Sequence, residues 1–97
     1  MRTIRRTNQF KRDYKRETKG RSEAYVQKLD SEFGAVVQVL LADGTLDLRY
    51  EDHPLTGEWK DHRDCHVRPD LVLIYSKPDQ STLELVRLGS HSELFRR

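Results

Sequence analysis

The chain lacks the features that mark extracellular and membrane proteins. Cys65 is the only cysteine among the 97 residues, so no internal disulfide can form. No apolar run approaches the roughly 20 residues that a membrane span requires. The strongly basic N-terminal segment also has no apolar stretch that could act as a secretion signal. These absences exclude a membrane protein and predict a cytoplasmic location.

Internal repeats and low-complexity tracts are absent too, and the composition is that of one small folded unit. Apolar and charged residues each make up 35% of the chain, which is typical of a modest core with a heavily solvated surface. A chain of 97 residues has too little volume for two separate apolar cores. We therefore predict a single domain over residues 1–97.

The small net charge of +2 conceals an uneven distribution along the chain. Residues 1–21 contain nine Lys or Arg against two acids, a net charge of +7, and the remainder carries −5. A basic surface attracts RNA because phosphate contacts release bound counterions. An ordinary solvated helix surface would have the same composition, so both interpretations stay open at this point.

Local signals predict two helices in the N-terminal half. Residues 3–6 favour a short edge strand, after which Thr7 or Asn8 can cap a helix that ends at Gly20. A second helix begins near Ser22 and runs toward Gly44. Its predicted apolar stripe consists of Val26, Leu29, Phe33, Val36, Val37 and Leu40. The two helices should form a hairpin.

The C-terminal half indicates a sheet. A polar loop over residues 51–58 precedes predicted strands at 59–67, 71–75 and 82–88, of which the second is apolar throughout and so buried on both faces. Residues 90–93 match a capping box that starts a short helix. The predicted fold class is α+β, with a helical hairpin packed on an antiparallel sheet of three to five strands and a short C-terminal helix.

Histidines are the main candidates for chemistry. His53, His62, His66 and His91 all lie in the C-terminal half, most of them beside turns where side chains can converge. His91 would open a helix, where free N–H groups favour a bound anion, so a neutral imidazole there could accept a proton beside a phosphate. Phe95 emerges on the same helix face as His91 and either stacks on a nucleobase or anchors the helix in the core.

Other polar residues in this half have simpler explanations. Asp70 follows a proline in a turn, where it either caps backbone N–H groups or orients a histidine. His62, Cys65 and His66 suggest a metal site, but no second ligand pair exists and strand alternation would place neighbours on opposite faces, so no metal is predicted. Nothing nearby stabilises a thiolate at Cys65, and Trp59 is interpreted as a core residue, as is Tyr75.

Four segments together carry a family resemblance. They are Asp-His-Pro-Leu-Thr-Gly at 52–57, Arg-Asp-Cys-His-Val-Arg-Pro-Asp at 63–70, Leu-Ile-Tyr at 73–75 and Arg-Leu-Gly-Ser-His-Ser-Glu-Leu-Phe at 87–95. In this order and spacing they resemble the YafQ branch of the RelE toxin superfamily. The resemblance implies the RelE-like fold and an endoribonuclease that cleaves mRNA in the ribosomal A site.

The resemblance also implies roles for individual residues. The functional histidines of the family fall on His53, His66 and His91, its acidic residue on Asp70 and its terminal aromatic on Phe95. His62 has no counterpart. The family pattern has a tryptophan where this chain has Leu71. Leu71 is therefore a candidate substrate contact that lacks the aromatic ring with which a tryptophan stacks on a nucleobase. Candidate phosphate ligands are Arg63 and Arg87.

The predicted reaction is an attack by a ribose 2′-OH on the adjacent phosphate, which needs a base, an acid and no metal or other cofactor. His66 and His91 would share the acid and base duties, Asp70 would tune or replace one of them, and His53 would contact the phosphate or join the proton transfer. Expected partners are the ribosome with its mRNA, a cognate antitoxin, and operator DNA only through the toxin–antitoxin complex. The alternatives are a non-catalytic RNA- or ribosome-binding module and a ribonuclease that needs no ribosome.

Overall fold

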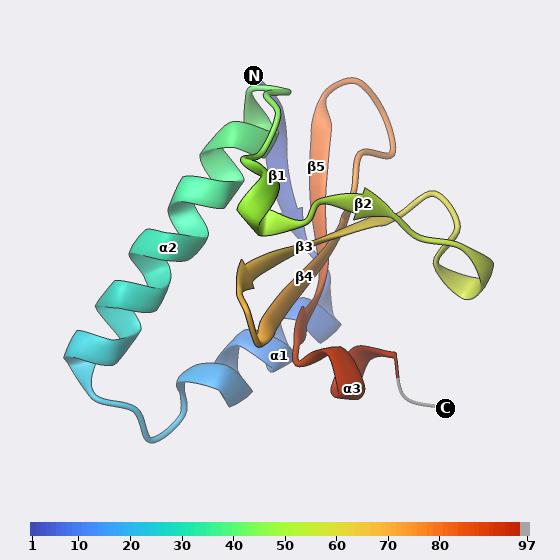
Figure 1. Cartoon of the computed structure of the whole chain (residues 1–97). Coiled ribbons are helices and arrows are strands. Elements are labelled where there is room, and N and C mark those ends of the chain that lie inside the picture. Colours follow the sequence, from blue (N-terminus) through green and yellow to red (C-terminus); the bar gives the residue numbers. More distant parts are fainter. Residues whose placement is uncertain (96–97) are drawn as a thin grey trace.

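The computed structural model describes residues 1–95 and confirms the α+β class, with two long helices against a five-stranded sheet (Figure 1). The helices are α1 (Asn8–Thr18), α2 (Glu23–Leu41) and α3 (His91–Leu94). The strands are β1 (Thr3–Arg6), β2 (His53–Pro54), β3 (Arg63–Arg68), β4 (Leu71–Ser76) and β5 (Thr82–Gly89). Single turns of 3-10 helix occur at Leu48–Tyr50 and Gly57–Trp59.

Side-chain caps set the start of each helix. The Thr7 hydroxyl accepts a hydrogen bond from the Phe10 N–H at 2.9 Å, and Ser22 does the same for the first turn of α2. The left-handed residue that ends α2 is Asp43, with a φ of 57°, one position before the predicted stop at Gly44. No helix within residues 1–95 is both long and apolar enough to cross a membrane.

The sheet has the order β1-β5-β4-β3-β2, with β4 at its centre and all six of its residues buried, as the apolar run predicts. One expectation was wrong: β1 pairs in parallel with β5, so the sheet is mixed rather than antiparallel throughout. The two long helices and the three intervening strands separate these two partners in the chain, and such long connections permit parallel pairing.

The strand expected at 59–67 begins only at Arg63. The preceding residues form a 3-10 turn, and Asp61 adopts a left-handed φ of 70°, which reverses the chain. This reversal lets the two residues of β2, inside the predicted polar loop, pair with β3 in antiparallel fashion. The turn and β2 thus extend the sheet beyond its predicted edge.

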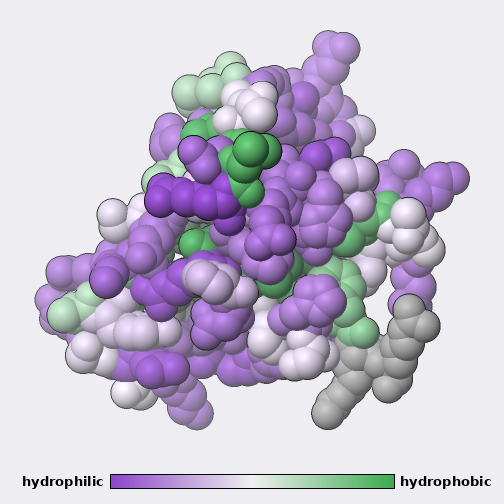
Figure 2. All heavy atoms as spheres, in the orientation of Figure 1, coloured by the Kyte–Doolittle hydropathy of each residue, from purple (hydrophilic) through white to green (hydrophobic). Residues whose placement is uncertain are grey.

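Apolar side chains pack on both faces of the sheet. The larger core fills the space between the sheet and the helices and includes Leu29 and Leu73, both fully buried. A smaller core on the opposite face contains Val72, Ile74 and Leu94. Figure 2 shows a mostly hydrophilic surface in which apolar side chains appear as small separate patches. The smaller core holds α3 against the sheet and so positions the residues described next.

Candidate active site

Three elements bring histidines to the sheet face that lies opposite the helices. His53 lies on β2, His66 on β3 and His91 at the start of α3. Side chains alternate along β3, so His66 shares its face with Asp64, while Cys65 points into the core beneath the helices. Residues distant in the sequence therefore meet on one face.

Asp64 lies beside His53 in this cluster, with 1% of its side chain exposed. Burial raises the pKa of Asp64 above its ordinary value, although the positive charges that His53, His66 and His91 can carry all act on this carboxylate and oppose the shift. A buried carboxyl group whose pKa is influenced by three imidazoles is typical of catalytic sites. Asp64 was not among the residues predicted from the sequence, although its spacing of two from His66 in a strand was a usable signal.

The ring of His53 is held from two sides. Its Nδ1 lies 2.8 Å from the carbonyl oxygen of Glu51 and 3.1 Å from Oδ1 of Asp64. A neutral imidazole can donate only one proton from Nδ1. The Glu51 carbonyl oxygen has a better geometry than Oδ1 of Asp64 to accept it. Within residues 1–95, Oδ1 of Asp64 is consequently left without a hydrogen bond. The Nδ1–H tautomer leaves Nε2 of His53 as an acceptor for substrate.

His91 packs against Phe95, with ring centroids 4.7 Å apart and planes inclined by 45°. The predicted capping box of this helix is confirmed, because the Ser90 hydroxyl accepts from the Glu93 N–H at 3.2 Å and Glu93 accepts from the Ser90 N–H at 2.9 Å. The helix is only four residues long, so few peptide dipoles align there. The predicted stabilisation of a bound anion by the N-terminus of this helix is therefore small.

Cys65 shows no sign of nucleophilic character. The thiol is fully buried, and burial raises its pKa to about 12, so it stays protonated near neutral pH. Within residues 1–95 no group of three or more histidine, cysteine or acidic residues is placed to hold a metal ion.

A family model described as the bacterial toxin of the type II toxin–antitoxin system, YafQ, matches residues 2–96. The chain belongs to the YafQ toxin family. The mRNA interferase toxin YafQ of Escherichia coli K12 is 48% identical over 61 residues, which cover 61% of this chain and 65% of that relative. The matched segment thus spans about 65% of the length of this curated relative.

Solved structures of family members show the same fold. A metal-bound toxin from Helicobacter pylori is 43% identical, covers 98% of this chain and 100% of its own, and superposes with a TM-score of 0.82. YafQ in the E. coli DinJ–YafQ complex is 32% identical, covers 98% of this chain and 99% of its own, and superposes with a TM-score of 0.79. The resemblance that the four sequence segments carried is therefore confirmed at the level of family and fold.

The two predicted phosphate ligands, Arg63 and Arg87, each form an ion pair with a carboxylate of the same chain. Arg63 faces away from Asp64 and lies 3.2 Å from a carboxylate oxygen of Asp52. Arg87 donates from Nε to Asp13 on α1 at 2.8 Å. Phosphate binding by either arginine stays a prediction, and each phosphate would compete with a carboxylate of the chain.

The contacts of two further predicted residues, Asp70 and Leu71, do not involve the histidines in the described part of the chain. Asp70 is exposed in the turn between β3 and β4, and its side chain makes no hydrogen bond within residues 1–95, so its role stays a prediction. Leu71 is 5% exposed and belongs to the core beneath the helices. The pleat of β4 turns this side chain away from the histidine face, so contact between Leu71 and substrate stays a prediction.

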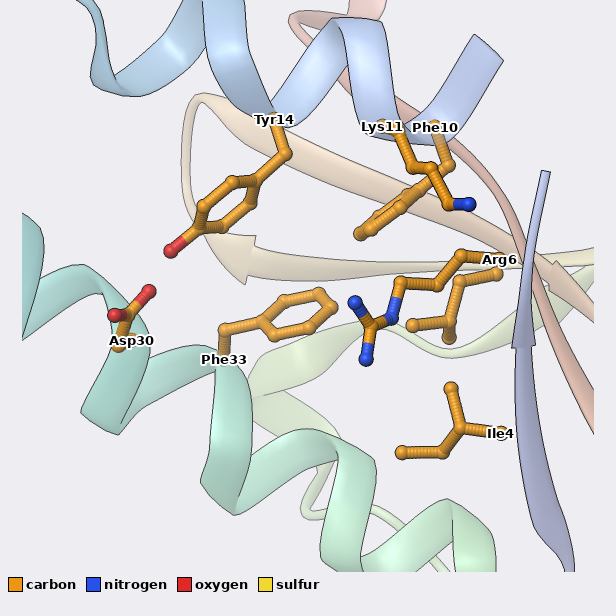
Figure 3. Close-up of a pocket in the computed structure, with 8 residues that line it drawn as sticks. Ile4, Arg6, Phe10, Lys11, Tyr14, Asp30 and Phe33 are labelled. Carbon is orange, nitrogen blue, oxygen red and sulfur yellow. The ribbon is translucent and has the colours of Figure 1, made fainter. Parts of the chain in front are cut away.

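A separate hollow lies on the helix side of the sheet (Figure 3). Its volume is about 410 Å³, and Phe10 and Phe33 face each other across it with ring centroids 5.8 Å apart. Arg6 and Lys11 border it, but none of the histidines lines it. The hollow is therefore not a candidate for the acid and base chemistry that the histidine cluster offers.

Proposed function

We propose that this chain is an mRNA interferase toxin, an endoribonuclease that cleaves mRNA in the ribosomal A site and so inhibits translation. The observation that carries the proposal is the buried Asp64, which lies 3.1 Å from the His53 ring and within electrostatic range of His66 and His91, in a YafQ-family fold. The E. coli relative described above is an mRNA interferase by name, which supports the same reaction here.

The chemistry needs only proton transfers and charge stabilisation. A base removes the proton of a ribose 2′-OH, whose oxygen forms a bond to the adjacent phosphorus, and an acid protonates the 5′-oxygen as its bond to phosphorus breaks. The products are a 2′,3′-cyclic phosphate and a 5′-hydroxyl, with no net change in oxidation state. His66 and His91 share the acid and base duties, with His53 contacting the phosphate or joining the proton transfer.

Asp64 adds a carboxylate to the three histidines that carry out the proton transfers. Its charge compensates an imidazole that has taken up the 2′-OH proton, in the way that buried carboxylates orient and stabilise catalytic histidines elsewhere. Asp70, the acid that the family resemblance indicates, tunes or replaces one of the histidines. The reaction uses no metal and no other cofactor.

The basic N-terminal segment supplies attachment to the ribosome. Lys15 and Lys19 are exposed on or next to α1 and can contact ribosomal RNA, as other basic residues of this segment can. Phosphate contacts of this kind position a protein without reading sequence. Because the ribosome is the site of action, the proposed location is the cytoplasm.

A cognate antitoxin is the proposed regulator. The E. coli relative forms a complex with DinJ, and this chain shares 98% of its length with the YafQ of that complex. By analogy an antitoxin would bind this chain and silence it, and the toxin–antitoxin complex would contact operator DNA.

Mapping of mRNA 5′ ends tests the proposal directly. Purified protein is added to bacterial ribosomes programmed with mRNA, and naked mRNA and a His91→Ala variant are run alongside. Discrete cuts in the A site that need both the ribosome and His91 are expected. Cuts on naked mRNA would favour a ribosome-independent ribonuclease. Ribosome binding without any cut would favour the alternative of a non-catalytic binding module.

A further inference from the structure

A cavity of about 570 Å³ separates the loop after β2 from the C-terminal turn. The loop contributes one wall and α3 with Phe95 contributes the other. The residues that line the cavity are Leu55, Thr56, Gly57, Glu58, Trp59, Leu94 and Phe95. Phe95 also packs on the ring of His91, with centroids 4.7 Å apart, so the cavity and one member of the histidine cluster share this side chain as a neighbour.

The walls are suited to a flat apolar group. Trp59 and Phe95 are only partly buried, although both pack against the small core on this face of the sheet. Among the described lining residues Glu58 is the only charged one, and its carboxylate would repel a phosphate. A nucleobase has aromatic faces for the two rings, and its amino groups can donate to a carboxylate, so it matches both features.

Backbone hydrogen bonds hold the tryptophan wall in place. The Trp59 N–H donates to the Thr56 carbonyl at 3.2 Å, and the His62 N–H donates to the Trp59 carbonyl at 2.9 Å. Gly57 takes a left-handed φ of 65°, which tightens the turn. The His62 ring meets the Trp59 ring edge-on, with centroids 5.4 Å apart. The loop is therefore shaped before any ligand arrives.

We propose that Trp59 and Glu58 complete a nucleobase subsite in this cavity. Trp59 stacks on a base opposite Phe95, the aromatic that the family resemblance already indicates for substrate, and Glu58 accepts a hydrogen bond from the amino group of that base. The inference rests on the proposed function for its natural substrate, mRNA. It makes Trp59 and Glu58 determinants of which base is accepted. Adenine, cytosine and guanine carry amino groups and would bind better than uracil, which has none.

The intrinsic fluorescence of Trp59 offers a test that needs no cleavage, since it is the single tryptophan of the chain. The probes are 2′-O-methyl RNA trinucleotides, which have no free 2′-OH to attack, and an abasic trinucleotide serves as the control for phosphate contacts. Saturable quenching by the trinucleotides that carry bases is expected. Phe95→Leu should weaken this binding on the order of tenfold, while Tyr14→Leu, in the separate hollow, should leave it unchanged.

Two results in this titration would overturn the subsite. One is the absence of quenching at millimolar trinucleotide, and the other is equal quenching by the abasic control. The Glu58→Gln variant tests the polar contact in the same assay. It should bind uracil-containing probes as tightly as adenine-containing ones, and an unchanged preference for adenine would refute the role of Glu58.

Cleavage on programmed ribosomes then separates the subsite from the proposed function. Trp59→Phe keeps an aromatic wall and should retain the base preference, whereas Trp59→Leu should need about tenfold more protein and cut with a flattened preference. If the unaltered protein cuts and both variants cut identically, the subsite is wrong and the nuclease stands. If the unaltered protein never cuts but trinucleotides quench Trp59, the nuclease is wrong and the subsite stands.

Discussion

Asp13 should contribute more to stability than any other carboxylate whose contacts are described within residues 1–95. It lies on α1 with no exposed surface and accepts hydrogen bonds from Gln9, Arg16, Arg87 and the backbone N–H of Leu88, at 2.8–3.3 Å. These contacts fasten α1 to the end of β5, immediately before the turn into α3. Replacing Asp13 by alanine leaves all of these donors without their acceptor.

The size of the loss follows from this burial. Breaking a buried ion pair by removing one partner costs about 3–5 kcal/mol. Arg87 keeps 24% of its side chain exposed and can turn toward water, so we expect about 3 kcal/mol for Asp13→Ala. The assay is urea denaturation followed by circular dichroism. Asp43→Asn is the matched control, because Asp43 pairs with Arg2 and Lys77 at the surface and should contribute far less.

The acid dependence of stability provides a second measurement on the same residue. Burial by itself raises the pKa of Asp13, but the hydrogen bonds from Arg87, Leu88 and Gln9 outweigh it and hold the pKa below its usual value of 3.8. A carboxyl with a lowered pKa in the folded state stabilises the fold above that usual value, and this stability is lost as the pH falls below it. Asp13→Asn should therefore flatten the loss of stability in acid. A loss below about 1 kcal/mol for Asp13→Ala, or an unchanged acid slope for Asp13→Asn, would refute this reasoning.

Four other outcomes are expected. Asp64→Asn should lower the cleavage rate about 100-fold and alter the pH–rate profile without loss of fold, and an unchanged profile would remove Asp64 from the site. Leu29→Ala, at a fully buried core position, should cost about 3 kcal/mol in urea denaturation, whereas a change under 1 kcal/mol would indicate a core that refills. Cys65 should resist iodoacetamide in the folded protein and react in urea, because burial raises its thiol pKa to about 12. Replacing Lys15 and Lys19 by glutamine should weaken ribosome binding and reduce its salt dependence, with cleavage of bound mRNA unchanged.

Much of the secondary structure was predictable because its causes are local. The caps at Thr7 and Ser22, the capping box at residues 90–93 and the buried run of β4 each depend on residues within a few positions of one another. Helix periodicity likewise identified the face of α2 that packs on the sheet. The start of β3 at Arg63 escaped prediction, because the turn before it depends on pairing with β2.

Some features of the candidate site were also predictable from local sequence, while others depend on strand pairing. The family, the α+β class and the candidacy of His53, His66 and His91 could all be predicted from the sequence, because short segments of fixed spacing carry them. The folded arrangement was needed to see that Asp64 is buried beside His53, that Leu71 faces the helices, and that Trp59 and Phe95 border one cavity. The physical reason is that contacts across a sheet depend on which strands pair and in which register. These choices involve residues far apart in the chain, so no local pattern encodes them.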